Sequence, residues 1–271
     1  MAAASFDAFQ RGQVSAFTSG TGIGALAGLI GLGGAEFRLP VLIGVFRFGA
    51  LEAVIINKAM SLVVVASALP FRTGTTSIAT IAEQWPVIAN LLAGSLLGAW
   101  FGASWTTKLK SEMLYRVIAV LLVGMAVVLM IGHGIEGAGH PMFASPVQMV
   151  AGVVAGFAIG VVASLMGVAG GELLIPTLII LFGVDVKLAG SLSLAVSLPT
   201  MLVGFARYSR DSTFAVLRSN GRFVAAMAVG SVVGSFIGAK LLGLVPGSIL
   251  LPVLAVILLI SSVKLWRHRR I

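Results

Sequence analysis

The sequence predicts an all-α polytopic membrane protein built from two homologous halves. The chain of 271 residues is 58% hydrophobic and only 10% charged, with a mean hydropathy of +1.09, whereas soluble domains are about 25% charged. Several apolar runs approach the length of about 20 residues that spans the hydrocarbon of a bilayer. One glycine-containing stretch occurs twice at an offset of 136 residues, which predicts an internal repeat with a glycine-broken helix in each half.

The repeated stretch reads LIGLGGAEFRLPVLIGVF at 29–46 and LMGVAGGELLIPTLIILF at 165–182. Between 28–65 and 164–201, 12 of 38 ungapped positions are identical. Unbroken register over such a distance indicates duplication. We therefore predict a first transmembrane repeat at 1–135, a linker at 136–146 and a second transmembrane repeat at 147–271.

The apolar runs define the predicted segments in chain order. A glycine break at 31–35 follows the first segment, and the run after it is too short to cross a bilayer alone. Tryptophans bracket 85–105, as expected for rings at the membrane interface, and we predict a polar loop before it at 71–84. The predicted segments are 13–31, 39–48, 53–69, 85–105 and 113–131 in the first half, and 147–167, 173–183, 188–206, 222–242 and 249–266 in the second.

The basic residues favour one of two topologies. If the short segment after the break completes a crossing, each half has five segments and the second half is inverted. Most basic residues then fall on the side of both termini, which the positive-inside rule makes cytoplasmic. If the short segment is re-entrant, each half has four crossings, the repeats are parallel, and Lys108, Lys110 and Arg116 move to the opposite side. We favour inverted repeats in the cytoplasmic (inner) cell membrane.

The two glycine breaks are the predicted substrate site. Irregular backbone persists in a membrane only where protein or a water-filled cavity satisfies it. Two half-helix N-termini that meet near the midplane would form an anion site from backbone N–H groups and helix dipoles. The alternative is that the glycines only permit close helix packing, but the matched glycine, glutamate and proline positions of the two copies favour a site.

Glu36 and Glu172 lie at matched positions inside apolar stretches. A carboxylate at mid-membrane costs roughly 2.5–3.5 kcal/mol on insertion scales, and a position in the first helical turn would offset part of that cost. Each glutamate is therefore either a helix-capping group or a proton-coupling carboxylate.

Other polar side chains of the same segments are further candidates for substrate binding. Arg38 and Lys58 have leucines as repeat partners, so either could supply a positive charge specific to the first half; the alternatives are a pairing of Arg38 with Glu36, or snorkelling. A four-residue spacing places hydroxyl and amide groups on one helix face, where they either line the cavity or bond their own backbone. These residues are Asn57, Ser61, Ser193 and Ser197.

Two GxxxGxxxG faces predict close helix packing. They consist of Gly94, Gly98 and Gly102 in the first half and Gly230, Gly234 and Gly238 in the second. We expect these helices to pack against each other or against a second protomer, so a homodimer through these faces is allowed.

The composition argues against several classes of function. The chain has no cysteine, which removes disulfides, thiolate metal sites and cysteine catalysis, and no residues show metal-ligand spacing or a catalytic triad. We predict no enzyme activity, no metal and no cofactor. The net charge of +9 reflects basic loops rather than nucleic-acid binding, and the four arginines of 207–222 are expected to contact anionic lipid headgroups.

The segments GLGGAEFRLPVL at 31–42, GVAGGELLIPTL at 167–178 and AGSLSLAVS at 189–197 resemble the TauE/SafE family of sulfite exporters. The resemblance implies transport of small sulfur oxyanions or organosulfonates, such as sulfite or sulfoacetate. Ala35 and Ala169 each replace a glycine of the family pattern, so the two breaks are not equivalent. By position, the implied site contains Gly33, Gly34, Pro40, Gly170, Gly171 and Pro176, and we count Ala35 of the first break as a further candidate for substrate binding.

These observations together predict a secondary carrier of a small anion that works by alternating access. The alternatives are an anion channel, or a transporter of another small carboxylate or inorganic solute. An intramembrane enzyme and a non-transporting assembly partner are less consistent with two matched breaks and no catalytic cluster.

Overall fold

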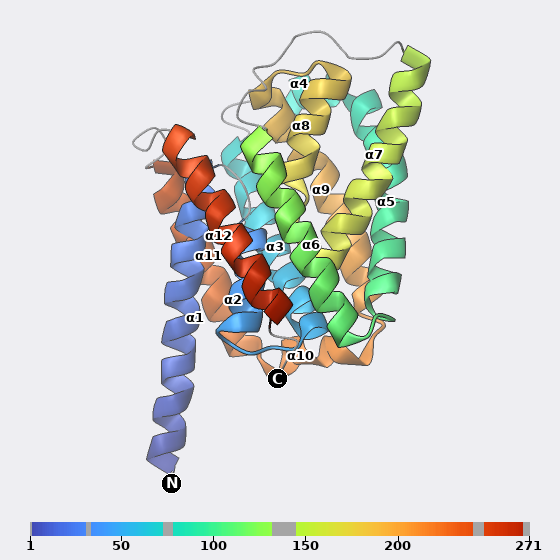
Figure 1. Ribbon diagram of the computed structural model, residues 1–271. Helices are drawn as coiled ribbons and strands as arrows, with labels where there is room; N and C mark the ends of the chain where they lie inside the picture. The colour runs from blue at the N-terminus through green and yellow to red at the C-terminus, as the bar shows by residue number, and fades with distance from the viewer. Residues whose placement is uncertain (1, 31–33, 73–77, 132–144, 241–246, 268–271) are drawn as a thin grey trace.

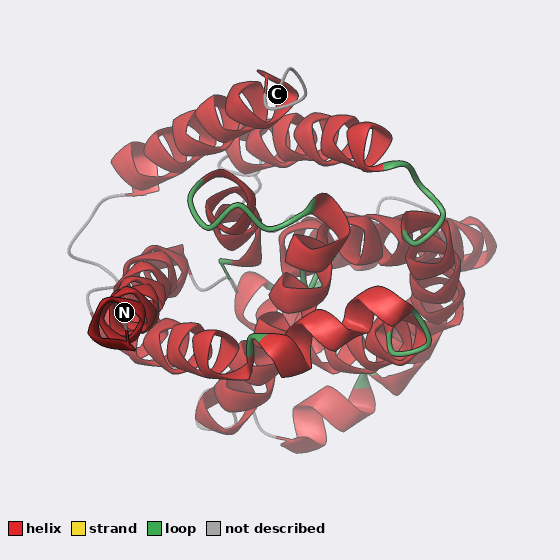
Figure 2. Ribbon diagram, turned by 90° about the horizontal axis from the view of Figure 1, so that it is seen from below, coloured by secondary structure: helices red, strands yellow, loops and turns green. Residues whose placement is uncertain are grey.

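The computed structural model describes residues 2–30, 34–72, 78–131, 145–240 and 247–267. Within these ranges the regular secondary structure is all helix, joined by short loops (Figures 1 and 2). The helices of the first half are α1 (Ala2–Ile30), α2 (Ala35–Gly44), α3 (Ala50–Arg72), α4 (Ile78–Glu83), α5 (Trp85–Thr106) and α6 (Ser111–Ile131). Those of the second half are α7 (Ser145–Met166), α8 (Gly171–Phe182), α9 (Val186–Tyr208), the 3-10 helix η2 (Ser212–Ala215), α10 (Val216–Ser219), α11 (Gly221–Lys240) and α12 (Gly247–Arg267).

The prediction of an all-α, multi-pass membrane protein is confirmed. Six helices of the described chain are long and apolar enough to cross a bilayer, and α8 is a shorter apolar helix. One detail of the prediction is wrong. The polar stretch 71–84 is not only a loop, because its residues from Ile78 form α4. The first apolar segment belongs to a longer helix that begins at Ala2.

Glycines set the closest helix pairs. A Cβ at Gly94 or Gly98 of α5 would overlap backbone oxygens of α7, and one at Gly230 or Gly234 of α11 would overlap backbone oxygens of α1. α7 and α1 also contribute glycines to these contacts. A Cβ added at Gly160 of α7, for example, would overlap the backbone oxygen of Ser95. Close packing through small residues is therefore confirmed.

The partner of each glycine face is a helix of the same chain. The expectation that α5 and α11 use these faces on each other, or on a second protomer, therefore needs correction, because α7 and α1 already cover them. A homodimer of this fold would have to use other surfaces.

The two halves interlock with opposite directions. α1 and α7 begin at opposite ends of the bundle, as do α5 and α11, and α6 and α12 (Figure 1). Shifted by 136 residues, the pair α1–α11 becomes the pair α7–α5, and both pairs are tightly packed. Both termini lie at one end of the bundle, with the connections at 45–49, 107–110 and 209–220 (Figure 1). The internal repeat stays a prediction from the sequence, and this packing agrees with its inverted form.

The half-helices α2 and α8 lie against α3 and α9, which also contact each other. α3 is buried along most of its length, and its polar residues Asn57, Lys58 and Ser61 are at most 1% exposed. Elsewhere the bundle exposes large apolar side chains such as Leu97 and Phe101, as a surface in contact with lipid requires. Several buried polar and charged groups of the described chain are thus gathered where the two breaks meet.

Candidate functional site

Both half-helices begin at a glycine in the left-handed conformation. Gly34 has φ 63° directly before α2, and Gly170 has φ 82° directly before α8. A side chain at either position would be strained, which explains the matched glycines. Each glutamate lies in the first turn of its half-helix, as predicted. Gly33 lies outside the described residues.

Asn57 of α3 joins the two breaks. Its Nδ2 donates to the carbonyl oxygen of Ala35 at 2.9 Å and to that of Met166 at 3.0 Å. Ala35 starts α2 and Met166 ends α7, so one amide holds the start of one half-helix against the break that precedes the other. The two breaks, far apart in sequence, therefore meet in the interior.

Lys58 and Ser61 continue this contact along α3. Lys58 Nζ donates to the carbonyl oxygens of Ala163 at 3.1 Å and Val168 at 3.3 Å, and Ser61 Oγ donates to that of Gly167 at 3.3 Å. The last carbonyls of a helix lack intrahelical donors and carry the negative end of its dipole. The ammonium of Lys58 is thus placed where it stabilises the C-terminal end of α7.

Arg38 lies fully buried on α2. Its Nη1 donates to Asn57 Oδ1 and to Ser61 Oγ, both at 3.3 Å, and its charge also interacts with Glu36. Arg38 therefore rests on the same two α3 side chains that hold the end of α7. Whereas Lys58 Nζ donates to backbone carbonyls, Arg38 Nη1 donates to side chains, which can reorient.

The carboxyl groups of Glu36 and Glu172 interact with each other across the two half-helix starts. Glu36 is fully buried and Glu172 is 5% exposed. Within the described chain, neither carboxyl oxygen of Glu36 has a hydrogen-bond donor, nor has Oε2 of Glu172. The positive helix ends predicted to receive an anion therefore already face two carboxyl groups of the protein.

The face of α9 that corresponds to the polar face of α3 makes fewer side-chain hydrogen bonds to other parts of the chain. Ser193 Oγ donates to the carbonyl of Gly190 in its own helix and lies 3.9 Å from the position that a Cβ would take on Gly171. Ser197 is 1% exposed, and its hydroxyl has no partner among the described residues. The two repeat partners Ser61 and Ser197 thus differ, because only Ser61 is bonded.

Pro40 and Pro176 lie inside α2 and α8. A proline has no N–H, so the carbonyls of Glu36 and Glu172, four residues earlier, lose their usual intrahelical donors. The prolines therefore leave both half-helices weakened next to the carboxyl pair, at matched positions.

The sequence did not single out a second set of polar contacts. Ser95 of α5 bonds Thr200 of α9 at 2.7 Å between hydroxyl oxygens, and Ser164 of α7 donates to the carbonyl of Ala99 of α5 at 2.9 Å. Tyr208 of α9 donates to the carbonyl of Ser164 at 2.8 Å, and Arg207 Nε donates to Ser104 Oγ at 2.7 Å. Hydroxyl groups are common in apolar helices, so the sequence alone gives no reason to select Ser95. Only its buried position against α9 in the structure identifies this contact.

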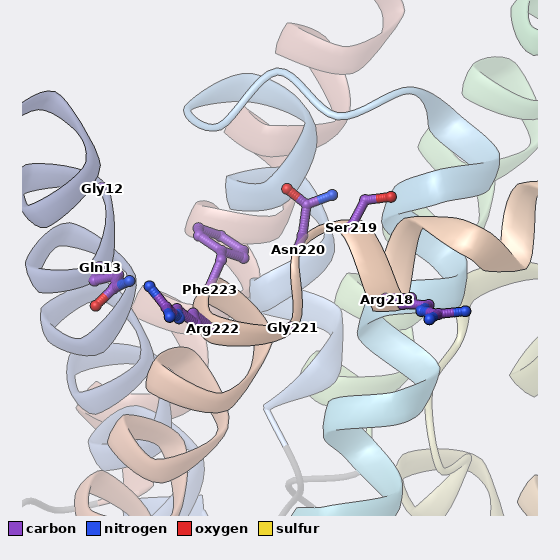
Figure 3. A pocket seen from close by; sticks show the side chains of 8 residues that line it. All are labelled: Gly12, Gln13, Arg218, Ser219, Asn220, Gly221, Arg222 and Phe223. Carbon is purple, nitrogen blue, oxygen red and sulfur yellow. The ribbon is translucent and has the colours of Figure 1, made fainter. Parts of the chain in front are cut away.

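The arginine-rich stretch 207–222 forms η2, α10 and the start of α11 at the end of the bundle that carries both termini. A hollow of about 650 Å³ there is lined by Gly12, Gln13, Arg218, Ser219, Asn220, Gly221, Arg222 and Phe223. In Figure 3, Arg222 extends toward α1 and Arg218 points the opposite way. This hollow is separate from the two breaks, and its exposed arginines agree with the expected headgroup contact.

The described residues contain no group of His, Asp and Glu that could hold a metal ion. In comparisons with known proteins, the family model described as sulfite exporter TauE/SafE matches residues 16–265. No curated protein and no solved structure matches the chain.

Proposed function

We propose that the chain is a secondary carrier of a small sulfur oxyanion or organosulfonate, such as sulfite or sulfoacetate. It belongs to the sulfite exporter TauE/SafE family and is a membrane transporter rather than an enzyme. We place it in the cytoplasmic membrane with both termini cytoplasmic, because the loops at that end carry most of the arginines and lysines.

One observation carries the proposal. The N-termini of α2 and α8 meet inside the bundle, and Asn57 bonds the backbone of both breaks. The first N–H groups of each half-helix have no intrahelical acceptor, and two such ends that converge in a membrane favour an anion.

The candidate residues form two groups, according to the hydrogen bonds that they make in this structure. Asn57, Lys58 and Ser61 are occupied by backbone carbonyls, so in this proposal they hold the break in shape. Substrate contact falls to the backbone of Gly34, Ala35, Gly170 and Gly171, to Arg38, and to the hydroxyls of Ser193 and Ser197. Gly33 and the weakened first turns at Pro40 and Pro176 complete the set.

Glu36 and Glu172 are the candidates for proton coupling. Two buried carboxylates that face each other repel, and a proton on the pair removes that repulsion. Neutralising either by substitution with Gln is expected to abolish flux driven by a pH gradient while anion exchange continues. Unchanged driven flux in both variants would rule out this role.

In this proposal, alternating access uses the two glycine-packed pairs of helices, α5–α7 and α1–α11. The α5–α7 pair is bonded to α3 and α9 through Lys58, Ser61, Ser95 and Tyr208. The α1–α11 pair meets the core through apolar contacts such as Phe223 with Phe46 and Phe48, and α11 packs less extensively on α3 than α5 does on α9. We propose that the α1–α11 pair moves relative to the rest during transport.

The test is flux into proteoliposomes that contain the purified protein. Sulfite, thiosulfate, sulfate, a short organosulfonate, acetate and chloride are each offered as labelled anions. A saturable response confined to sulfur anions is the expected result. Non-saturating flux of all anions would indicate a channel, and a preference for acetate would indicate a carboxylate carrier. No flux from folded protein would refute the proposal.

A further inference from the structure

The charged groups around the two breaks balance each other. Glu36 and Glu172 contribute two carboxyl groups, and Arg38 and Lys58 contribute two cations. Among the described residues of α2, α3, α7, α8 and α9 that pack around the breaks, the remaining buried polar side chains are neutral, among them Asn57, Ser61, Ser164, Ser193 and Ser197. With all four groups ionised, this layer of the bundle has no net charge.

Neither cation can move with a substrate unless the hydrogen bonds that it makes around the two breaks are broken. Lys58 is bound to the end of α7, and Arg38 rests on Asn57 and Ser61, which bond the same end. In contrast, both carboxyl oxygens of Glu36 and Oε2 of Glu172 have no hydrogen-bond donor among the described residues. We therefore place the change of charge on the carboxyl pair.

An anion that enters at the half-helix starts competes with the two carboxylates for the same positive ends. It would also leave a net negative charge in a buried region of the bundle, which is strongly unfavourable unless the charge is compensated. Protons that arrive with the anion restore neutrality and release the helix ends.

We propose that the carrier is electroneutral, and that each anion crosses together with as many protons as it has negative charges, held by Glu36 and Glu172. This inference rests on the proposed anion transport and specifies its coupling ion and stoichiometry. The pair has room for two protons, so the mechanism covers monoanions and dianions.

The experiment uses the full chain in proteoliposomes loaded with a pH-sensitive dye, with the membrane potential set by potassium and valinomycin. Methanesulfonate is the monoanion and sulfate the dianion, and proton uptake is measured against anion uptake. The expected ratios are one proton per methanesulfonate and two per sulfate, with rates independent of the potential. Anion uptake without protons, or an equal ratio for both anions, would overturn the inference while leaving anion transport intact.

The doubly substituted Glu36→Gln, Glu172→Gln variant gives a second reading. It is expected to carry methanesulfonate without protons, so that its flux becomes dependent on the potential. Glu83→Gln, at an exposed position on α4, is the control and should keep the ratio of the unsubstituted protein. If no anion moves in any folded protein, the proposed function fails and this inference fails with it; if the double variant does not fold, the ratios of the unsubstituted protein decide.

Discussion

Lys58 Nζ lies 3.1 Å from the carbonyl oxygen of Ala163, which connects the middle of α3 in the first half to the end of α7 in the second. The same ammonium also donates to the carbonyl oxygen of Val168, inside the break that leads from α7 into α8. A single cation thus fixes both the end of one helix and the start of the break. Its repeat partner Leu194 offers no such group.

Replacing Lys58 with Met should destabilise the protein. The substitution keeps the length of the side chain but leaves the carbonyl of Val168 without its donor, at a cost of about 1–3 kcal/mol for a buried unsatisfied group. Part of this is offset because a buried charge is also removed. Thermal unfolding in detergent measures the change, with exposed Lys110→Met expected to stay within about 0.5 kcal/mol. An equal or higher stability of Lys58→Met would contradict the role of Lys58 at the end of α7.

The repeat partners Ser61 and Ser197 should respond differently to alanine. Ser61→Ala removes the bonds to Gly167 and Arg38 and should cost about 1–3 kcal/mol. Ser197→Ala removes a buried hydroxyl without a partner, so stability should be unchanged or slightly higher, whereas the KM for the anion should rise if Ser197 contacts substrate. Thermal unfolding and concentration-dependent uptake separate the two effects. Equal destabilisation by both substitutions would argue against the bonding difference.

Gly98 should not tolerate a methyl group. The Cβ of Gly98→Ala would overlap the backbone oxygen of Phe157, and overpacking of this kind typically costs 1–3 kcal/mol. Gly124→Ala on α6 is the matched control, because nothing lies within 4 Å of its Cβ and alanine is favoured over glycine in a helix by about 1 kcal/mol. The two variants should therefore shift the unfolding temperature in opposite directions. An unfolding temperature of Gly98→Ala that is raised as much as that of Gly124→Ala would show that α5 and α7 are not in close contact.

Introduced cysteine pairs should report the proposed movement of α1–α11. The chain has no native cysteine, so a Ser95→Cys, Thr200→Cys pair is free of background and should cross-link in the conformation described above. The offset of 136 residues maps this contact onto Val64 and Ser231, whose hydroxyl has no partner among the described residues. If the inverted halves exchange their packing during transport, a Val64→Cys, Ser231→Cys pair should cross-link in the other conformation.

The two pairs should respond oppositely to conditions that shift the carrier between its conformations, and each cross-link should block uptake until it is reduced. Gel mobility and uptake before and after reduction give both readings. Simultaneous, condition-independent cross-linking of both pairs in one molecule would exclude an exchange of packing.

Much of the candidate site was predictable because membrane burial makes polar residues conspicuous. The matched positions of Glu36 and Glu172, and of Gly34 and Gly170, indicated the starts of two half-helices, which α2 and α8 confirm. The roles of Asn57 and Lys58 were not predictable, because their partners are backbone carbonyls more than 100 residues away, and backbone groups carry no sequence signal. The helices that pack on the glycine faces were not predicted correctly for a similar reason. A GxxxG pattern specifies a close approach but not the helix that makes it.

The class of the protein, the positions of the two breaks and the carboxyl group in the first turn of each half-helix could all be predicted from the residues alone. These features follow from local rules, since apolar length sets a crossing and a glycine with positive φ sets a helix start. The interaction of the two carboxyl groups and the bonds of Lys58 to the end of α7 became apparent only in the folded chain. The same is true of the helices that cover the glycine faces. Such relationships depend on which helices become neighbours, and packing over the whole bundle sets this.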